Sequence, residues 1–286
     1  MKASESQFLQ IRGLRYHVRH WPAPGAPKIV LLHGWMDVSA SFQFIVDALE
    51  RDWDVYAPDW RGYGLTAWAK ADSYWFPDYL ADLDQILDHL EVSAVNLVGH
   101  SMGGHVAALY AGVRPARVAK FVNLEGFGLA ATGPEQAPKR YARWLDELRE
   151  PPRLRPYESF AELAERLQSA NKRLSRERAE FLARHWGQEV NGHVTLRGDP
   201  THKVVNPVLY RQDEVRACWQ LVTAPVLWVE AAESDALKRV GLDSAAHAER
   251  RAAFRDLRHV TVPDAGHMLH HDQPAAVAHL IEEFLG

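Results

Sequence analysis

The sequence has little cysteine, no long apolar run and no strong excess of charge. Its one cysteine, Cys218, leaves no intramolecular disulfide and no thiolate cluster for zinc. No apolar run approaches the roughly 18 residues needed to cross a membrane. The N-terminal stretch MKASESQFLQIRGLRYHVRH contains no apolar segment typical of a secretory signal. We therefore expect a cytoplasmic protein without a membrane partner.

The charges nearly balance, because 33 Lys and Arg residues face 37 Asp and Glu residues, for a net charge of −4. This balance gives no electrostatic sign of a nucleic-acid partner. The 286 residues are 47% hydrophobic, which is enough for one large core, and the aromatic residues can also supply pocket walls. We expect a small-molecule substrate and a monomer or homodimer.

Six short apolar runs without polar alternation predict strands that are buried on both faces. These runs are residues 28–32, 53–57, 94–98, 118–124, 225–229 and 259–262. Segments with apolar residues at helical spacing alternate with them, for example residues 42–49, 80–90 and 277–284. The pattern predicts an α/β fold with a mostly parallel sheet and helices on both faces. Residues 6–21 are expected to form a hairpin at the sheet edge.

Residues 127–215 interrupt this alternation with a mainly helical pattern. Ser159 followed by Glu162 is typical of a helix start, and Asn191-Gly192 is typical of a tight turn. We expect this block to be a helical cap (lid) inserted between the sixth and seventh strands, with residues 1–126 and 216–286 forming the core. The cap would lie over the carboxyl edge of the sheet, where open α/β folds bind ligands.

A candidate nucleophile lies in the sequence GHSMG at residues 99–103, between a predicted strand and a predicted helix. In such a G-x-S-x-G turn the serine has a strained backbone, and glycines on both sides avoid collisions. Ser101 would therefore point out over the sheet edge. The amides of Met102, at the helix N-terminus, and Trp35, after the first parallel strand, are the candidate oxyanion-hole donors. Gly34 would let the loop that carries Trp35 approach Ser101.

A serine nucleophile needs a base that is oriented by an acid. His267 lies between the last predicted strand and the last predicted helix, so it is the expected base. The chain order for this turn is Ser, acid, His, and the acid should follow the strand at 225–229. We favour Asp235, with Glu233 and Glu125 as open alternatives. Glu125 ends the preceding strand and could also reach the histidine.

His270 and His271 follow His267 closely and suggest a metal cluster. The sequence shows no carboxylate or thiolate arranged with them, so we expect no metal and no organic cofactor. Asp37 is expected to cap the helix that follows it, with binding of a polar substrate group as the alternative. The candidate substrate-pocket residues are Gly34, His100, Trp144 and Trp186, with Trp35, Trp60 and Trp75 as further aromatic candidates.

Together these residues resemble the α/β-hydrolase superfamily over essentially the whole chain. The matching motifs are HGW at 33–35, DWRGYG at 59–64, GHSMGG at 99–104 and GH at 266–267. They look most like the serine-hydrolase-like and carboxylesterase groups, although Ala231 or Ala232 stands where a glycine is usual.

The resemblance implies a serine hydrolase that cleaves a carboxylic ester of a small or medium, partly apolar substrate through an acyl-enzyme intermediate. The same triad could serve a carbon–carbon bond hydrolase, a lactonase, an amidase or a cofactor-free perhydrolase. A non-catalytic binding member of the fold is the alternative outside the enzymes.

Overall fold

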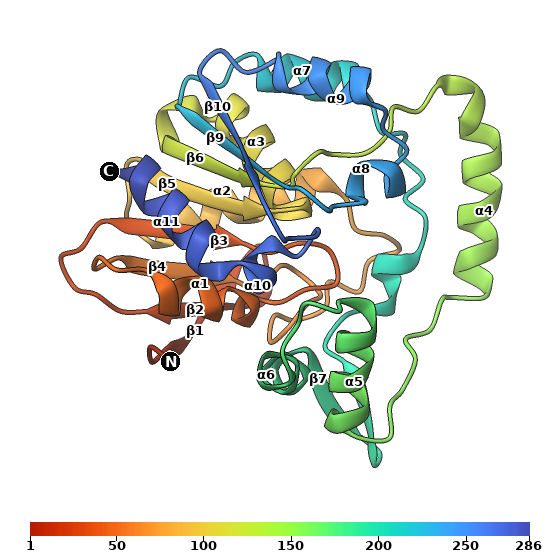
Figure 1. Ribbon diagram of the computed structural model, residues 1–286. Coiled ribbons are helices and arrows are strands. Elements are labelled where there is room, and N and C mark those ends of the chain that lie inside the picture. Colours follow the sequence, from red (N-terminus) through yellow and green to blue (C-terminus); the bar gives the residue numbers. More distant parts are fainter.

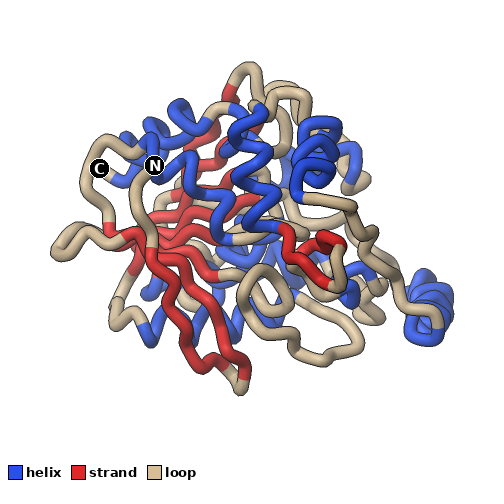
Figure 2. The backbone as a smooth tube through the Cα atoms, turned by 90° about the horizontal axis from the view of Figure 1, so that it is seen from below, coloured by secondary structure: helices blue, strands red, loops and turns tan.

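The computed structural model describes residues 1–286, and an eight-stranded sheet lies at its centre (Figure 1). Its strands, in spatial order, are β1 (Glu5–Ile11), β2 (Leu14–Trp21), β4 (Asp54–Pro58), β3 (Lys28–Leu32), β5 (Val95–His100), β6 (Val118–Leu124), β9 (Val226–Ala231) and β10 (Leu257–Val262). Strand β2 is antiparallel to β1 and β4, whereas β4, β3, β5, β6, β9 and β10 run parallel. The predicted mostly parallel sheet is confirmed, and the expected N-terminal hairpin projects from its edge (Figure 2).

The sheet is buried on both faces, which explains why its strands read as unbroken apolar runs. Along β3, Ile29 and Leu31 point to one face, whereas Val30 and Leu32 point to the other. Helices α1 (Gln43–Ala48) and α11 (Pro274–Leu285) cover the first face, and α2 (Phe76–His89) and α3 (Met102–Val113) cover the second (Figure 1). Helix–sheet–helix layering results, as expected for this α/β class.

The remaining helices lie in the inserted segment or near the C-terminal half of the sheet. They are α4 (Ala137–Arg149), α5 (Phe160–Ala170), α6 (Arg176–Trp186), α7 (Gln212–Trp219), α8 (Ala236–Arg239), α9 (Ser244–Arg251) and α10 (Leu269–Asp272). Each helix of the chain is too short or too polar to cross a lipid bilayer.

The segment between β6 and β9, the sixth and seventh strands of the sheet, holds α4 to α7 and a hairpin of β7 (Gly187–Val190) and β8 (His193–Leu196). Asn191 and Gly192 form the hairpin turn with positive φ angles of 52° and 79°, and the Ser159 hydroxyl accepts from the Glu162 amide at 3.2 Å. Helices α5 and α6 pack against each other, whereas α4 has no buried residue and stands apart from the sheet (Figure 1). Helix α7 packs on α3, so the segment returns to the core before β9.

Candidate active site

Ser101 occupies a tight turn between β5 and α3, with a left-handed φ of 51°. Its amide donates to the carbonyl of Leu124 at 2.8 Å, which holds the turn against β6. A side chain at Gly103 would collide with the carbonyl oxygen of Leu32, and one at Gly99 would collide with the backbone of α3. Glycine at both positions therefore lets α3 begin close to the sheet, in the strand, turn and helix order that the motif requires.

The side chains of Ser101, His267 and Glu125 form a hydrogen-bonded row. The Ser101 hydroxyl lies 3.0 Å from Nε2 of His267, and Nδ1 of His267 lies 3.1 Å from Oε2 of Glu125. A carboxylate can only accept, so the neutral histidine here carries its proton on Nδ1 and accepts from the serine through Nε2. This is the geometry in which a histidine can take the proton of a serine hydroxyl.

Glu125 is fixed by the end of β6 and by its neighbour β9. It is 1% exposed, and its backbone has a positive φ of 57°. The amide of Ala231 donates to its Oε1 at 2.7 Å, and the hydroxyl of Ser234 donates to its Oε2. These donors fix the buried carboxylate and aim it at His267.

The structure therefore corrects the expected place of the acid, because Asp235 does not reach His267. The Asp235 side chain is 68% exposed and pairs with Arg239 at 2.9 Å. The other alternative, Glu233, is 52% exposed and pairs with Arg173. Of the three carboxylates considered, only Glu125 contacts the histidine.

The two expected oxyanion donors lie beside Ser101. Met102 is the first residue of α3, where a helix provides no acceptor for the N–H. Gly34 packs so closely that a Cβ there would lie 3.2 Å from Cβ of Ser101, which brings the adjoining Trp35 loop to the serine. The Trp35 amide donates to no group of the protein, while its indole N–H donates to the carbonyl of His202 at 3.3 Å.

Ser101 and His267 open into a cavity of about 750 Å³. Hydrophobic residues make up 15 of its 24 lining residues, so the cavity suits a partly apolar ligand. The apolar and aromatic wall consists of Trp35, Met36, Tyr74, Trp75, Phe76, Tyr79, Met102, Phe127, Leu129, Ala130, Val204, Tyr210, Ala236, Val240 and Met268.

The four predicted pocket residues do not line this cavity. Gly34 and His100 lie behind Ser101, and His100 Nε2 contacts the carbonyl oxygen of His267 at 2.8 Å. Burial lowers the pKa of His100 well below its usual value, so it is a neutral positioning group. Trp186 instead donates to the Ser41 hydroxyl at 3.1 Å, and Trp144 is half-buried on α4. Among the other tryptophans, Trp35 and Trp75 line the cavity, whereas Trp60 is in the core.

Two arginines and a buried histidine are among the polar residues that line the cavity. Arg239 is paired with Asp235, but Arg140 of α4 forms no salt bridge and donates to the carbonyl of Asn206 at 3.1 Å. Both ring nitrogens of His105 are buried without a hydrogen-bond partner. Burial, with the nearby Arg250, lowers the pKa of His105 to about 3, so its ring is neutral. The cavity thus offers an unpaired cation to a ligand and no unpaired carboxylate.

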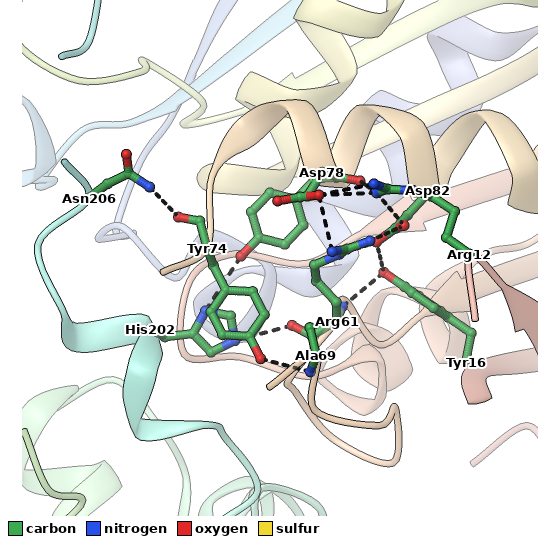
Figure 3. Close-up of polar contacts among 10 residues, drawn as sticks. Arg12, Tyr16, Arg61, Ala69, Tyr74, Asp78, Asp82, His202 and Asn206 are labelled. Atoms are coloured by element: carbon green, nitrogen blue, oxygen red, sulfur yellow. Dashed lines mark hydrogen bonds and ion pairs between the residues drawn. The ribbon is translucent and has the colours of Figure 1, made fainter. Parts of the chain in front are cut away.

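A polar network holds the wall formed by Tyr74 and His202 (Figure 3). The His202 ring lies between the rings of Tyr63 and Tyr74, with centroids 3.7 and 3.8 Å away, and its Nε2 lies 3.1 Å from the carbonyl oxygen of Arg61. The Arg61 guanidinium in turn donates two bonds, of 2.6 and 2.5 Å, to the fully buried Asp82. None of these wall residues was predicted from the sequence, because the inserted segment and the β4–α2 loop meet only in the folded chain.

Comparisons with known proteins agree with this architecture. The profile of the family described as alpha/beta hydrolase fold matches residues 27–274. The chain is 28% identical over 273 residues to a serine hydrolase-like protein of Danio rerio, which covers 92% of this chain and 82% of that protein. It is 27% identical over 285 residues to the 3-hydroxybutyrate-oligomer hydrolase of Cupriavidus necator, with coverages of 96% and 93%.

Among solved structures, the thioesterase domain from the curacin biosynthetic pathway has a TM-score of 0.88 at 25% identity, covering 98% of this chain and 99% of that domain. The family profile spans most of the chain, and the sheet order, turn and helices described above agree with it. The chain therefore belongs to the alpha/beta hydrolase fold family.

Proposed function

We propose that the chain is a serine hydrolase that cleaves a carboxylic ester or thioester through an acyl-enzyme intermediate. The row of Ser101, His267 and Glu125, with contacts of 3.0 and 3.1 Å at a cavity wall, is the observation that supports this proposal most strongly. A serine alone is a weak nucleophile at neutral pH, and this row supplies both a base and the acid that orients it.

In the first half of the reaction, Oγ of Ser101 attacks the carbonyl carbon while Nε2 of His267 takes its proton. Glu125 keeps the Nδ1 proton on the ring and stabilises the imidazolium that forms. The imidazolium then gives its proton to the leaving alcohol or thiol, and the acyl group stays on Ser101. In the second half, His267 takes a proton from water and the resulting hydroxide attacks the acyl carbon. The bond between this carbon and Oγ of Ser101 then breaks, the imidazolium returns its proton to Oγ, and the free acid leaves.

The amides of Trp35 and Met102 bind the negative oxygen of each tetrahedral intermediate. Both donors lie next to Ser101 and are backbone N–H groups. The negative charge of the intermediate therefore meets donors whose positions are fixed by the backbone. Such donors are more effective in the transition state than in the ground state, because the carbonyl oxygen becomes an anion only there.

The cavity favours a medium-sized acyl or alcohol group with aromatic or aliphatic surface and a carboxylate at its far end. The wall is mainly apolar, and Arg140 is a cation without a carboxylate partner. Residues of the inserted segment, such as Arg140 and Tyr210, complete the cavity, so this segment acts as the cap. The chain is similar to a 3-hydroxybutyrate-oligomer hydrolase and to a thioesterase domain. These two similarities support acyl transfer from oxygen or from sulfur.

The first experiment labels the wild type and Ser101→Ala with a fluorophosphonate probe and then measures turnover of p-nitrophenyl esters from acetate to palmitate. We expect labelling and turnover in the wild type only, with turnover falling as the acyl chain outgrows the cavity. Labelling without ester turnover would indicate that the enzyme cleaves a lactone or a carbon–carbon bond instead. Absence of labelling in the folded wild type would contradict the proposed nucleophile.

A second experiment tests the carboxylate preference with p-nitrophenyl butyrate and p-nitrophenyl hemisuccinate, which are similar in length but differ in charge. Arg140→Gln should raise KM for the hemisuccinate by about 3- to 10-fold, since a partly exposed charged hydrogen bond contributes about 1 kcal/mol. The matched control is Arg143→Gln on the same helix, because Arg143 pairs with Glu147 and does not line the cavity. If Arg140→Gln and Arg143→Gln changed KM for the hemisuccinate equally, a specific role for Arg140 would be refuted.

A further inference from the structure

Directly behind His267, three buried side chains from distant parts of the chain converge. Asp37 comes from the loop after β3, and His270 and His271 come from α10. They are 3%, 0% and 2% exposed, and one ligand atom from each lies within 4.8 Å of the other two. The sequence argument against a metal was that no carboxylate accompanies the two histidines, and the fold supplies one.

The two oxygens of Asp37 differ in their partners. Oδ1 accepts from the Val38 amide at 2.7 Å and from the Ser41 hydroxyl, which fixes the carboxylate. The expected helix cap is wrong, because Val38 is the N-cap residue of the helix at Ser39–Phe42 and the Ser39 amide donates to Asp59 instead. Oδ2 is buried and has no hydrogen-bond partner, and Nε2 of His270 is 3.7 Å away. That distance is too long for a hydrogen bond.

The rings of the two histidines also have buried nitrogens without hydrogen-bond partners. Both ring nitrogens of His270 and Nε2 of His271 are buried without a hydrogen-bond partner in the protein. Phe42 and Phe44 pack against these rings, with centroid distances of 5.6 and 5.8 Å, so the surroundings are apolar. No lysine or arginine pairs with Asp37. Buried charges in proteins are normally paired or coordinate a metal, and unpaired buried polar atoms are costly.

We propose that Asp37, His270 and His271 form a binding site for a zinc ion, with a water molecule as the fourth ligand. A carboxylate oxygen and two imidazole nitrogens are a zinc donor set, and imidazole disfavours calcium and magnesium. Tetrahedral ligand atoms about 2 Å from zinc lie roughly 3.3 Å apart, so the present spacings need only small side-chain shifts. The bonds from Val38 and Ser41 to Oδ1 are the outer contacts that orient a ligating carboxylate.

The ion would have a structural role. It would join the loop that carries Trp35 to the segment that carries His267, and so hold two parts of the candidate active site in register. His267 and Ser101 are not among its ligands, so zinc binding can be tested whether or not the proposed hydrolase reaction is correct.

The test uses full-length protein without a histidine tag, produced in medium supplemented with zinc sulfate and dialysed. Metal content is measured by mass spectrometry for the wild type, Asp37→Asn, His271→Gln and the control His259→Gln. His259 belongs to a separate contact with Glu230, at 3.2 Å, which could bind adventitious zinc. We expect about one zinc ion per chain in the wild type and control, and a loss in both site variants.

A second readout keeps the proposal testable if a site variant fails to fold. Wild-type protein produced with cobalt in place of zinc should show the intense visible absorption of four-coordinate cobalt, and removal of the metal by dipicolinate should lower the unfolding temperature. Wild-type protein without stoichiometric zinc and without this absorption would overturn the proposal. Equal zinc in the wild type and the folded site variants would also overturn it, because the ion would then bind elsewhere.

Discussion

Replacement of Glu125 by Gln removes one charge at a side chain of nearly the same shape, so it isolates the electrostatic role of the proposed acid. Glu125 is 1% exposed and lies 3.1 Å from the nitrogen of His267 that becomes part of an imidazolium in the transition state. At an effective dielectric constant of about 20, opposite unit charges at the 3.1 Å contact attract by about 5 kcal/mol. This energy corresponds to roughly 10⁴-fold in rate.

Glutamine can still contact the Ala231 amide and the His267 ring, which offsets part of this loss. We therefore expect kcat/KM of Glu125→Gln to fall by about 10³- to 10⁴-fold. Asp235→Asn is the comparison, because Asp235 is 68% exposed and contacts Arg239 rather than His267. Its kcat/KM for a neutral ester should stay within about twofold of the wild type.

The assay is initial-rate hydrolysis of p-nitrophenyl butyrate, together with the rate of fluorophosphonate labelling. Circular dichroism and the unfolding temperature show whether each variant is folded, which matters because Glu125 accepts bonds from two groups of the β9 end. A folded Glu125→Gln with near-normal turnover, or an Asp235→Asn that loses activity to the same extent, would refute the assignment of Glu125.

Three further predictions concern the framework of the site. Gly103→Ala should lower the unfolding temperature strongly and abolish fluorophosphonate labelling, since its Cβ would meet the carbonyl oxygen of Leu32; a stable, labelled variant would contradict this close approach. Asp82→Asn should reduce the free energy of unfolding in urea by about 3 kcal/mol, because the buried Arg61 loses its bidentate partner; a change below about 1 kcal/mol would show that the pair is dispensable. The pKa values of His105 and His202 are each lowered to about 3, mainly by burial. Their neutral forms therefore stabilise the fold fully above about pH 6.5, and stability is lost as the pH falls towards 3. Between about pH 6 and 4, the two histidines should together lower the free energy of unfolding in urea by roughly 2.7 kcal/mol for each unit that the pH falls. His202→Gln should remove about half of this pH dependence, and an unchanged pH dependence in the variant would contradict this account.

The sheet and the nucleophile turn could be predicted because their signals are local. A strand buried on both faces must be apolar at every position, and residues 28–32 form β3 with the predicted bounds. The turn at Ser101 needs glycine at fixed offsets, and the collisions at positions 99 and 103 give the physical reason. Both requirements are visible in short stretches of sequence.

The cavity could not be predicted in the same way, because its wall comes from separate parts of the chain. Tyr74 and Phe76 precede or begin α2, whereas His202 and Tyr210 follow the β7–β8 hairpin. Helical periodicity identifies which residues of one helix share a face, but it does not say which loops meet. For the same reason, the sequence alone did not predict that Asp37 lies beside the histidines of α10.

The choice between Glu125 and Asp235 depends on the order of strands in space. Strands β6 and β9 are neighbours in the sheet, so carboxylates after either strand begin near the same edge. Glu125 directly follows β6, and its left-handed backbone turns the chain there, whereas Asp235 lies beyond β9 at the start of α8. With His267 held by Glu125, Asp235 is left to partly neutralise Arg239 at the cavity, and Arg140 remains the unpaired cation there. The acid position therefore bears on both the proposed chemistry and the proposed substrate charge.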